Sequence, residues 1–134
     1  MKLDNILVGD YSGTPETLHE IRIIDFGFAA KYRDPNGEHI KQLETNIFRS
    51  NMIFATANQF EFKASSRRDD MISMCYLLIF LFKGGLVPFI APPNLSKRDI
   101  FNYIHDVKKK TTNLQFCDGL PSGNIFLEFM DHIF

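Results

Sequence analysis

The chain has 134 residues, of which 45% are hydrophobic and 13% aromatic, and its formal net charge is −1. This length suits one domain or one lobe of a larger domain, and the apolar content argues against intrinsic disorder. The near-zero charge argues against a protein devoted to nucleic acid or to a membrane surface. Two cysteines, Cys75 and Cys117, are too few for a disulfide framework. The N-terminus has no apolar segment of a signal peptide, so we expect an intracellular protein, cytoplasmic or nuclear.

Two short β-branched runs predict a hairpin at the start of the chain. They are Ile6–Val8 and Ile21–Ile24, and a turn-rich stretch separates them. Asn5 precedes the first run and Asp25 follows the second. In an antiparallel hairpin, the residue before the first strand lies beside the residue after the second. We therefore expect the side-chain oxygen of Asn5 and the carboxylate of Asp25 to come within reach of one ion.

The residue types around this hairpin favour Mg²⁺ and phosphate. One amide and one carboxylate are hard oxygen ligands that leave Mg²⁺ its waters and room for substrate phosphates. Gly27 permits a sharp turn after Asp25, and Lys2 could supply a positive charge for a phosphoryl group. An isolated Asp-x-Gly after a strand is more often an ordinary turn. The ordered combination of "KLDN", a hairpin-sized gap and "IIDFG" favours the ion site over that alternative.

The middle of the chain changes from loop to helix. Residues 28–66 show little periodicity, and "YRDPNGEH" within them has turn chemistry. A loop of this length in a compact domain is usually functional. From Asp69, "DDMISMCYLLIFLFKGG" begins with carboxylates and stops at a glycine pair. It is apolar almost all round, which predicts a central, buried helix.

Two further helices complete the predicted order. "SKRDIFNYIHDVKKK" has Ser96 and Asp99 as a capping box, and we expect Lys108–Lys110 to form a solvated helix end rather than a polyanion site. "NIFLEFMDHIF" carries an apolar stripe at helical spacing: Phe126, Phe129, Met130 and Ile133. The fold class predicted from these elements is mainly α, an α+β domain with a small β-hairpin at its edge.

Several of these segments resemble eukaryotic protein kinases. "KLDNILV" resembles the end of their catalytic loop, and "IIDFGFAAKYRDPNGEHI" their metal-binding Asp-Phe-Gly and the start of their activation segment. "SSRRDDMISMCYLLIFLFKGGLVPF" and "LPSGNIFLEFMDHIF" are similar to the casein kinase 1 family. The resemblance covers nearly the whole chain. It implies a C-terminal kinase lobe, with the catalytic-loop end, hairpin and Asp-Phe-Gly in residues 1–27, the activation segment in 28–66 and a helical core in 67–134.

The resemblance assigns roles to individual residues of the hairpin region. It implies that Lys2 contacts the transferred phosphate and that Asn5 and Asp25 bind Mg²⁺. Leu7 would line the floor of the adenine pocket. Phe26, which precedes Gly27, would pack in the apolar stack that links the two lobes. The implied cofactors are Mg²⁺ and ATP, and the implied partners of the parent kinase are ATP and a protein substrate.

Three residues of the central helix also match the family. Asp70 matches an aspartate that anchors the catalytic-loop backbone. Arg67 and Arg68 would brace the loop on the substrate side, and exposed surface arginines are an equally weighted alternative.

Other positions depart from the family pattern. The catalytic aspartate would fall before Met1, and the glycine-rich loop, the strand lysine and its glutamate belong to the smaller lobe. We therefore expect this chain alone to have no kinase activity and poor nucleotide affinity. By alignment with the family's docking loop, Arg49, Ser50 and Asn51 stand in place of Thr-Gly-Thr, and Ile53 replaces a basic residue. These changes put the family's preference for acidic substrates in doubt.

Three functions follow from these matches and departures. The first is the C-terminal lobe of a casein kinase 1-like protein serine/threonine kinase. The second is a catalytically inactive, pseudokinase-like module that serves as a scaffold or binding partner, and the third is a truncated gene product. The apolar stripe of the last helix would either pack on the core or form a patch for a protein partner.

Overall fold

The computed structural model describes residues 1–9, 14 and 19–134. The chain divides into two compact units, which we describe separately. The hairpin unit is Lys2–Ile40, and the helical unit is Lys41–Phe134 together with Met1. The predicted α+β class is confirmed, because the described residues form five α-helices and one two-stranded antiparallel sheet.

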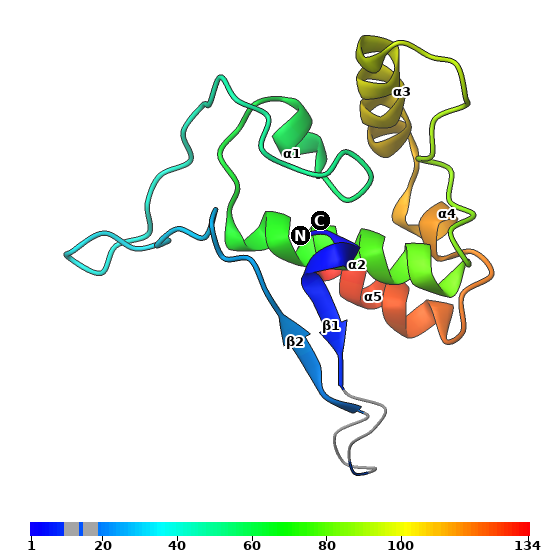
Figure 1. Ribbon diagram of the computed structural model, residues 1–134, viewed down its shortest axis with the longest axis horizontal. Coiled ribbons are helices and arrows are strands. Elements are labelled where there is room, and N and C mark those ends of the chain that lie inside the picture. Colours follow the sequence, from blue (N-terminus) through cyan, green and yellow to red (C-terminus); the bar gives the residue numbers. More distant parts are fainter. Residues whose placement is uncertain (10–13, 15–18) are drawn as a thin grey trace. The chain divides into compact units, whose positions relative to one another are not determined.

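The hairpin unit is built on two strands of three residues each (Figure 1). A short 3₁₀ turn, Leu3–Asn5, leads into β1 (Ile6–Val8), which pairs with β2 (Ile21–Ile23). The register places Ile6 opposite Ile23 and Val8 opposite Ile21. The amide of Ile24 donates to the carbonyl of Asn5 at 2.9 Å and extends the ladder to the residue before β1. The predicted hairpin is confirmed.

The second half of the hairpin unit is a tight turn rather than regular structure. Arg33 and His39 form an isolated antiparallel bridge, and the chain between them reverses at Gly37, whose φ is 84°. The Asp34 carboxylate closes this turn by accepting hydrogen bonds from the amides of Asn36 and Glu38, both at 2.9 Å. This agrees with the turn chemistry predicted for the sequence.

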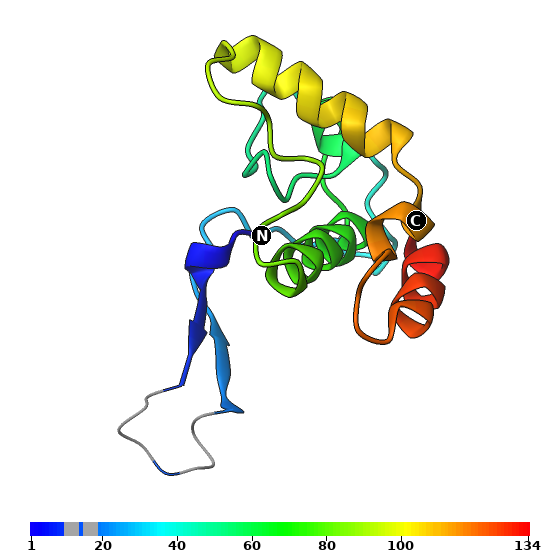
Figure 2. The ribbon, with the colours of Figure 1, turned by 90° about the vertical axis from the view of Figure 1, so that its right-hand side faces the viewer.

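The helical unit contains α1 (Ala57–Phe60), α2 (Arg67–Phe82), α3 (Lys97–Lys110), α4 (Asn113–Cys117) and α5 (Gly123–Ile133). Helix α2 lies between α3 and α5 in Figure 1, and Figure 2 shows it beside α5, with α3 above. It contributes Ile72, Cys75, Tyr76 and Ile79 to the core, as predicted for a central helix. The ring of Tyr76 contacts those of Phe89 and Phe116, with ring centroids 5.3 and 5.5 Å apart. Aromatic contacts therefore join α2, α4 and the loop after α2.

Helix boundaries follow the caps. Helix α2 begins at Arg67 rather than at the predicted Asp69, because the Ser66 side chain is the N-cap and Asp69 is the third helical residue. Ser96 caps α3 by accepting a hydrogen bond from the Asp99 amide, but the predicted capping box is incomplete, because the Asp99 carboxylate accepts from the Ser96 hydroxyl. Helices α1 and α4 were not predicted; each is one short turn behind a complete capping box, formed by Thr56 with Gln59 and by Thr112 with Gln115.

Residues 43–64 hold more structure than their sequence suggests. The amide of Thr45 donates to the carbonyl of Phe62, and the amide of Ala64 donates to the carbonyl of Leu43, both at 2.7 Å. Residues 43–45 and 62–64 therefore run side by side, and α1 lies within the excursion between them. In the described part of the chain, no helix has the length and apolar character needed to cross a bilayer.

Candidate functional site

The hairpin register brings Asn5 and Asp25 together. Asn5 ends the 3₁₀ turn before β1, and its backbone carbonyl pairs with Ile24, the residue before Asp25. The side-chain Nδ2 of Asn5 lies 3.4 Å from Oδ2 of Asp25, so the amide and the carboxylate face each other at the open end of the hairpin. The juxtaposition expected from the two short strands is therefore present.

Asp25 itself adopts the left-handed conformation. Its φ is 62°, a region that few residues other than glycine occupy and that asparagine and aspartate tolerate best. The side chain is held by its own turn, because Oδ1 accepts a hydrogen bond from the Gly27 amide at 3.3 Å. The sequence assigned the sharp turn to Gly27, whereas the positive φ is at Asp25. Gly27 contributes in another way, since a Cβ there would lie 3.3 Å from Oδ1 of Asp25.

The donor set at this end of the hairpin fits a sparsely ligated cation. Among the residues that the structure describes, no three His, Cys, Asp or Glu side chains cluster in a way that could enclose a metal. Asn5 and Asp25 together offer one amide and one carboxylate, which suits Mg²⁺ bound chiefly through water and phosphate. The Asn5 amide presents its nitrogen to Asp25. A flip of that amide would present its oxygen to a cation instead.

The other predicted residues of the hairpin unit surround this pair in sequence. Lys2 is extended and its carbonyl accepts a hydrogen bond from the Asn5 amide at 3.2 Å, so the backbone of Lys2 is joined to that of the pair. The side chain of Leu7 on β1 is exposed, as is that of Phe26 next to Asp25. The roles predicted for Lys2, Leu7 and Phe26 remain predictions.

Three predicted residues belong to the helical unit. Arg67 and Arg68 are the first two residues of α2, and both are exposed. Asp70 follows in the first turn and is also exposed, whereas its neighbour Asp69 is fully buried. The roles predicted for Arg67, Arg68 and Asp70 remain predictions, and the carboxylate that organises this region of the structure is Asp69.

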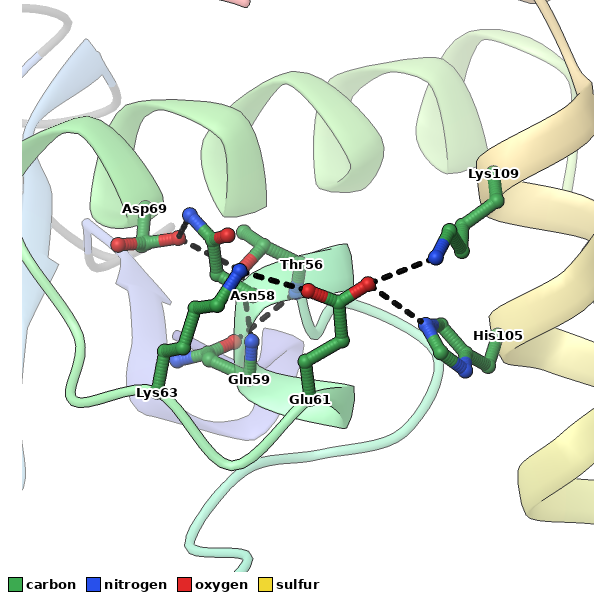
Figure 3. A network of polar contacts seen from close by, with 8 residues as sticks. All are labelled: Thr56, Asn58, Gln59, Glu61, Lys63, Asp69, His105 and Lys109. Atoms are coloured by element: carbon green, nitrogen blue, oxygen red, sulfur yellow. Dashed lines mark hydrogen bonds and ion pairs between the residues drawn. The ribbon is translucent and has the colours of Figure 1, made fainter. Parts of the chain in front are cut away.

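Asp69 is the centre of a buried hydrogen-bond network that the sequence did not predict (Figure 3). Its Oδ1 accepts hydrogen bonds from Thr56 Oγ1 at 2.7 Å and from Asn58 Nδ2 at 3.2 Å. Its Oδ2 accepts from the amide and the hydroxyl of Ser66, at 2.9 and 2.8 Å. One carboxylate therefore ties the start of α1 to the start of α2.

The ionisation of Asp69 is governed by this network. Burial by itself would raise the pKa of the carboxyl, because it disfavours the charged form, but the hydrogen bonds from Thr56, Ser66 and Asn58 outweigh burial and hold the pKa below its usual value. Asp69 is therefore a buried carboxylate with four donors in place of a cationic partner.

Gln59 extends the network towards the preceding loop. Its Oε1 accepts from the Thr56 amide at 2.9 Å and from Ser50 Oγ at 3.2 Å. Its Nε2 donates to Ser65 Oγ at 2.7 Å. Asn51 stabilises the same loop, because its Oδ1 accepts from the amide of Ile53 at 2.9 Å. Side-chain hydrogen bonds thus hold the loop residues on both sides of α1.

Glu61 links the end of α1 to α3 (Figure 3). Its two carboxylate oxygens pair with Lys109 at 2.8 Å and with Lys63 at 2.7 Å, and His105 Nε2 lies 3.6 Å away. Hydrogen bonds from Lys109 and Lys63 lower the pKa of Glu61 to about 2. The His105 ring also stacks on Phe60, with 5.5 Å between centroids. These contacts hold α3 against the α1 region.

The prediction of a solvated lysine run at the end of α3 is wrong for one residue. Lys109 and Lys110 are exposed, and Lys110 pairs with Asp106 one turn earlier at 2.8 Å. Lys108 is buried, with 5% of its surface accessible. The reason is its position four residues after the buried Ile104, which places it on the inward face of α3.

The chain was compared with protein families and with individual curated proteins. No family model matches the chain. The chain is 28% identical to a probable casein kinase I homolog of Encephalitozoon cuniculi, over 99% of this chain and 39% of the relative. It is 27% identical to casein kinase I homolog 2 of Schizosaccharomyces pombe, over 99% of this chain and 30% of that relative. The similarity supports a casein kinase I-like relationship, and the chain spans well under half the length of these two relatives.

Proposed function

We propose that the chain provides the larger, helical lobe of a casein kinase I-like protein serine/threonine kinase. The observation that carries the proposal is the Asn5–Asp25 pair, whose side chains face each other at 3.4 Å in a chain similar over its whole length to casein kinase I homologues. Residues 43–66 form a loop-like region with a dense polar network. We propose this region as the activation segment and the site of substrate docking.

In the whole kinase, these residues would position a nucleotide phosphate rather than perform covalent chemistry. Asn5 and Asp25 would hold Mg²⁺, which neutralises charge on the nucleotide phosphates when bound. The ammonium of Lys2 would neutralise the transferred phosphoryl group. Leu7 would contact the adenine and Phe26 would pack between the lobes, while Asp70, Arg67 and Arg68 would support the catalytic and substrate-side loops.

A metal-binding experiment tests the hairpin part of the proposal without requiring activity. Mn²⁺ added to ¹⁵N-labelled chain should broaden the side-chain amide signal of Asn5 and the backbone signal of Gly27, because both groups contact Asp25. Asp25→Asn should abolish the broadening, since it removes the only charge of the proposed ligand pair. ADP should strengthen the broadening by adding phosphate ligands.

Asp4→Asn is the matched control, because it removes a carboxylate from the residue next to Asn5 without touching the pair. Broadening that persists in Asp25→Asn and disappears in Asp4→Asn would contradict the assignment of Asp25. An absence of broadening at Asn5 and Gly27 in the unmodified chain, with and without ADP, would contradict the metal site itself.

Activity provides the second test. We expect the purified chain alone to transfer no labelled phosphate from Mg·ATP to an acidic peptide. Transfer by the pure chain, lost in Asp25→Asn, would overturn the expectation that this chain is inactive by itself and would strengthen the kinase assignment.

An inactive scaffold or binding module is the second candidate function. It is favoured by Ile53, an apolar residue that stands where a substrate-binding cation is expected in the docking loop. Normal folding together with a failure of the Mn²⁺ test would support this candidate over the kinase lobe.

A further inference from the structure

Lys108 has an environment unlike that of the other lysines in the α3 run. It lies at the C-terminal end of α3, where lysines normally reach into solvent. Its exposed fraction is 5%, while the side chains of Lys109 and Lys110 are 52% and 76% exposed. Lys108 is therefore a buried lysine within the helical unit.

The Lys108 ammonium donates to backbone carbonyls of one short segment. Its Nζ lies 2.5 Å from the carbonyl oxygens of Ile53 and Ala55 and 3.3 Å from that of Met52. These acceptors are more than 50 residues away in sequence and immediately precede Thr56, the N-cap of α1. An ammonium has three protons, so the three carbonyls of this segment can accept a hydrogen bond from each of them.

Aromatic rings cover the rest of the ammonium. Nζ lies 4.3 Å from the ring centroid of Tyr76, 4.9 Å from that of Phe89 and 5.7 Å from that of Phe60. The faces of such rings attract a cation. The three rings come from α2, the loop after α2, and α1, so the lysine is surrounded by the core of the helical unit.

Burial of the Lys108 side chain carries a desolvation cost that an apolar residue filling the same space would not have. In the described part of the chain, no carboxylate forms an ion pair with Lys108. Burial lowers the pKa of Lys108 well below its ordinary value, while the carbonyls and the ring faces favour the charged form. A methionine or leucine would fill the same volume without desolvating a charge. The contacts that only an ammonium can make are those to the three carbonyls.

We propose that Lys108 is a positioning residue that locks the backbone of residues 52–55. The docking segment, defined as Arg49–Ala55, would then be presented to a protein substrate in one conformation set from the end of α3. This functional meaning rests on the kinase function proposed above, whereas the lock is a property of the helical unit alone.

The lock is tested by amide hydrogen exchange in Lys108→Met. The amides of Phe54 and Ala55 both donate to the carbonyl of Asn51, at 3.1 and 2.8 Å, and report on the conformation of the docking segment. We expect their exchange to accelerate by about tenfold or more in Lys108→Met, while amides of α5 keep their rates, because loss of the lock opens the segment locally. Lys110→Met is the matched control and should leave both amides unchanged, because Lys110 is exposed and pairs with Asp106 on its own helix.

A second measurement uses the unmodified chain and does not depend on whether Lys108→Met folds. Native reductive methylation with ¹³C-formaldehyde should modify Lys109 and Lys110 and spare Lys108. In unmethylated chain, a hydrogen-bond scalar coupling should join the Lys108 Nζ to the carbonyl carbon of Ile53 or Ala55, which burial alone would not produce.

Two outcomes would overturn the lock: wild-type exchange rates for Phe54 and Ala55 in a folded Lys108→Met chain, or methylation of Lys108 at the rate of Lys110. Neither experiment involves metal, nucleotide or phosphate transfer. A failed Mn²⁺ test with a successful lock would reject the kinase assignment alone, and the reverse result would reject the lock alone.

Discussion

The two units of the chain are stabilised in different ways. The helical unit buries a continuous set of aromatic and aliphatic side chains around Tyr76 and Ile79, whereas none of the described residues of the hairpin unit is buried. The hairpin unit relies on a ladder of two three-residue strands and on turn hydrogen bonds. A two-stranded hairpin without a covered face is marginally stable in water. The proposed metal ligands therefore lie on the weaker scaffold and the proposed docking segment on the stronger one.

The largest contrast should come from deleting apolar side chains in each unit. Ile79→Ala empties a fully buried position of α2 and should lower the free energy of unfolding of the helical unit by about 2–5 kcal/mol. Val8→Ala removes a side chain that is 74% exposed on β1. It should change the free energy of unfolding of the hairpin unit by less than about 0.5 kcal/mol. Urea unfolding followed by far-UV circular dichroism measures both. Similar effects of the two substitutions would contradict the contrast.

A smaller effect is expected from the polar network around Asp69, which ties the start of α1 to the start of α2. Asp69→Asn leaves one oxygen where two accepted four hydrogen bonds, so donors of Thr56, Asn58 or Ser66 lose their acceptor. The expected loss in free energy of unfolding is about 2–3 kcal/mol. Asp70→Asn, at the exposed neighbouring position, is the control and should change it by less than about 0.5 kcal/mol. If both variants unfold at the same urea concentration, the network does not stabilise this unit.

The smallest effect is the acid sensitivity contributed by Glu61. Its folded pKa of about 2 lies below its ordinary value of 4.5, so the stabilisation is complete above that ordinary value and is lost as the pH falls towards 2. Since the pair with Lys109 is partly solvated, we expect less than about 1 kcal/mol. Glu61→Gln should flatten the dependence of unfolding on pH between these values. An unchanged slope in Glu61→Gln would show that other carboxylates account for it.

The parts predicted correctly from sequence depend on local patterns. The hairpin was predicted from two β-branched runs and an intervening turn, and pairing of adjacent strands then placed Asn5 beside Asp25. Helices α2, α3 and α5 were predicted because each is long enough to show apolar periodicity or a terminal signal. Helices α1 and α4 have four and five residues, too few for a periodic signal. Their Thr-x-x-Gln capping boxes were the available signal.

The parts that were missed depend on contacts between distant residues. The burial of Lys108 is compensated by carbonyls that lie 53–56 residues earlier in the chain, and nothing within the "KKK" run distinguishes it from its neighbours except its distance from Ile104. The family resemblance predicts an anchoring role for Asp70. The carboxylate that Thr56 and Asn58 contact is that of Asp69. Adjacent carboxylates on a helix point in different directions, and only the packed structure shows which one is buried.

The left-handed backbone at Asp25 affects how any substitution there must be interpreted. An alanine at a φ of 62° would strain the backbone by roughly 1 kcal/mol in addition to removing the carboxylate. Loss of binding in Asp25→Ala would therefore combine a chemical change with a conformational one. Asparagine tolerates the same backbone region and removes only the charge. A comparison of the asparagine, glycine and alanine variants would separate the ligand role of Asp25 from its role as a turn residue.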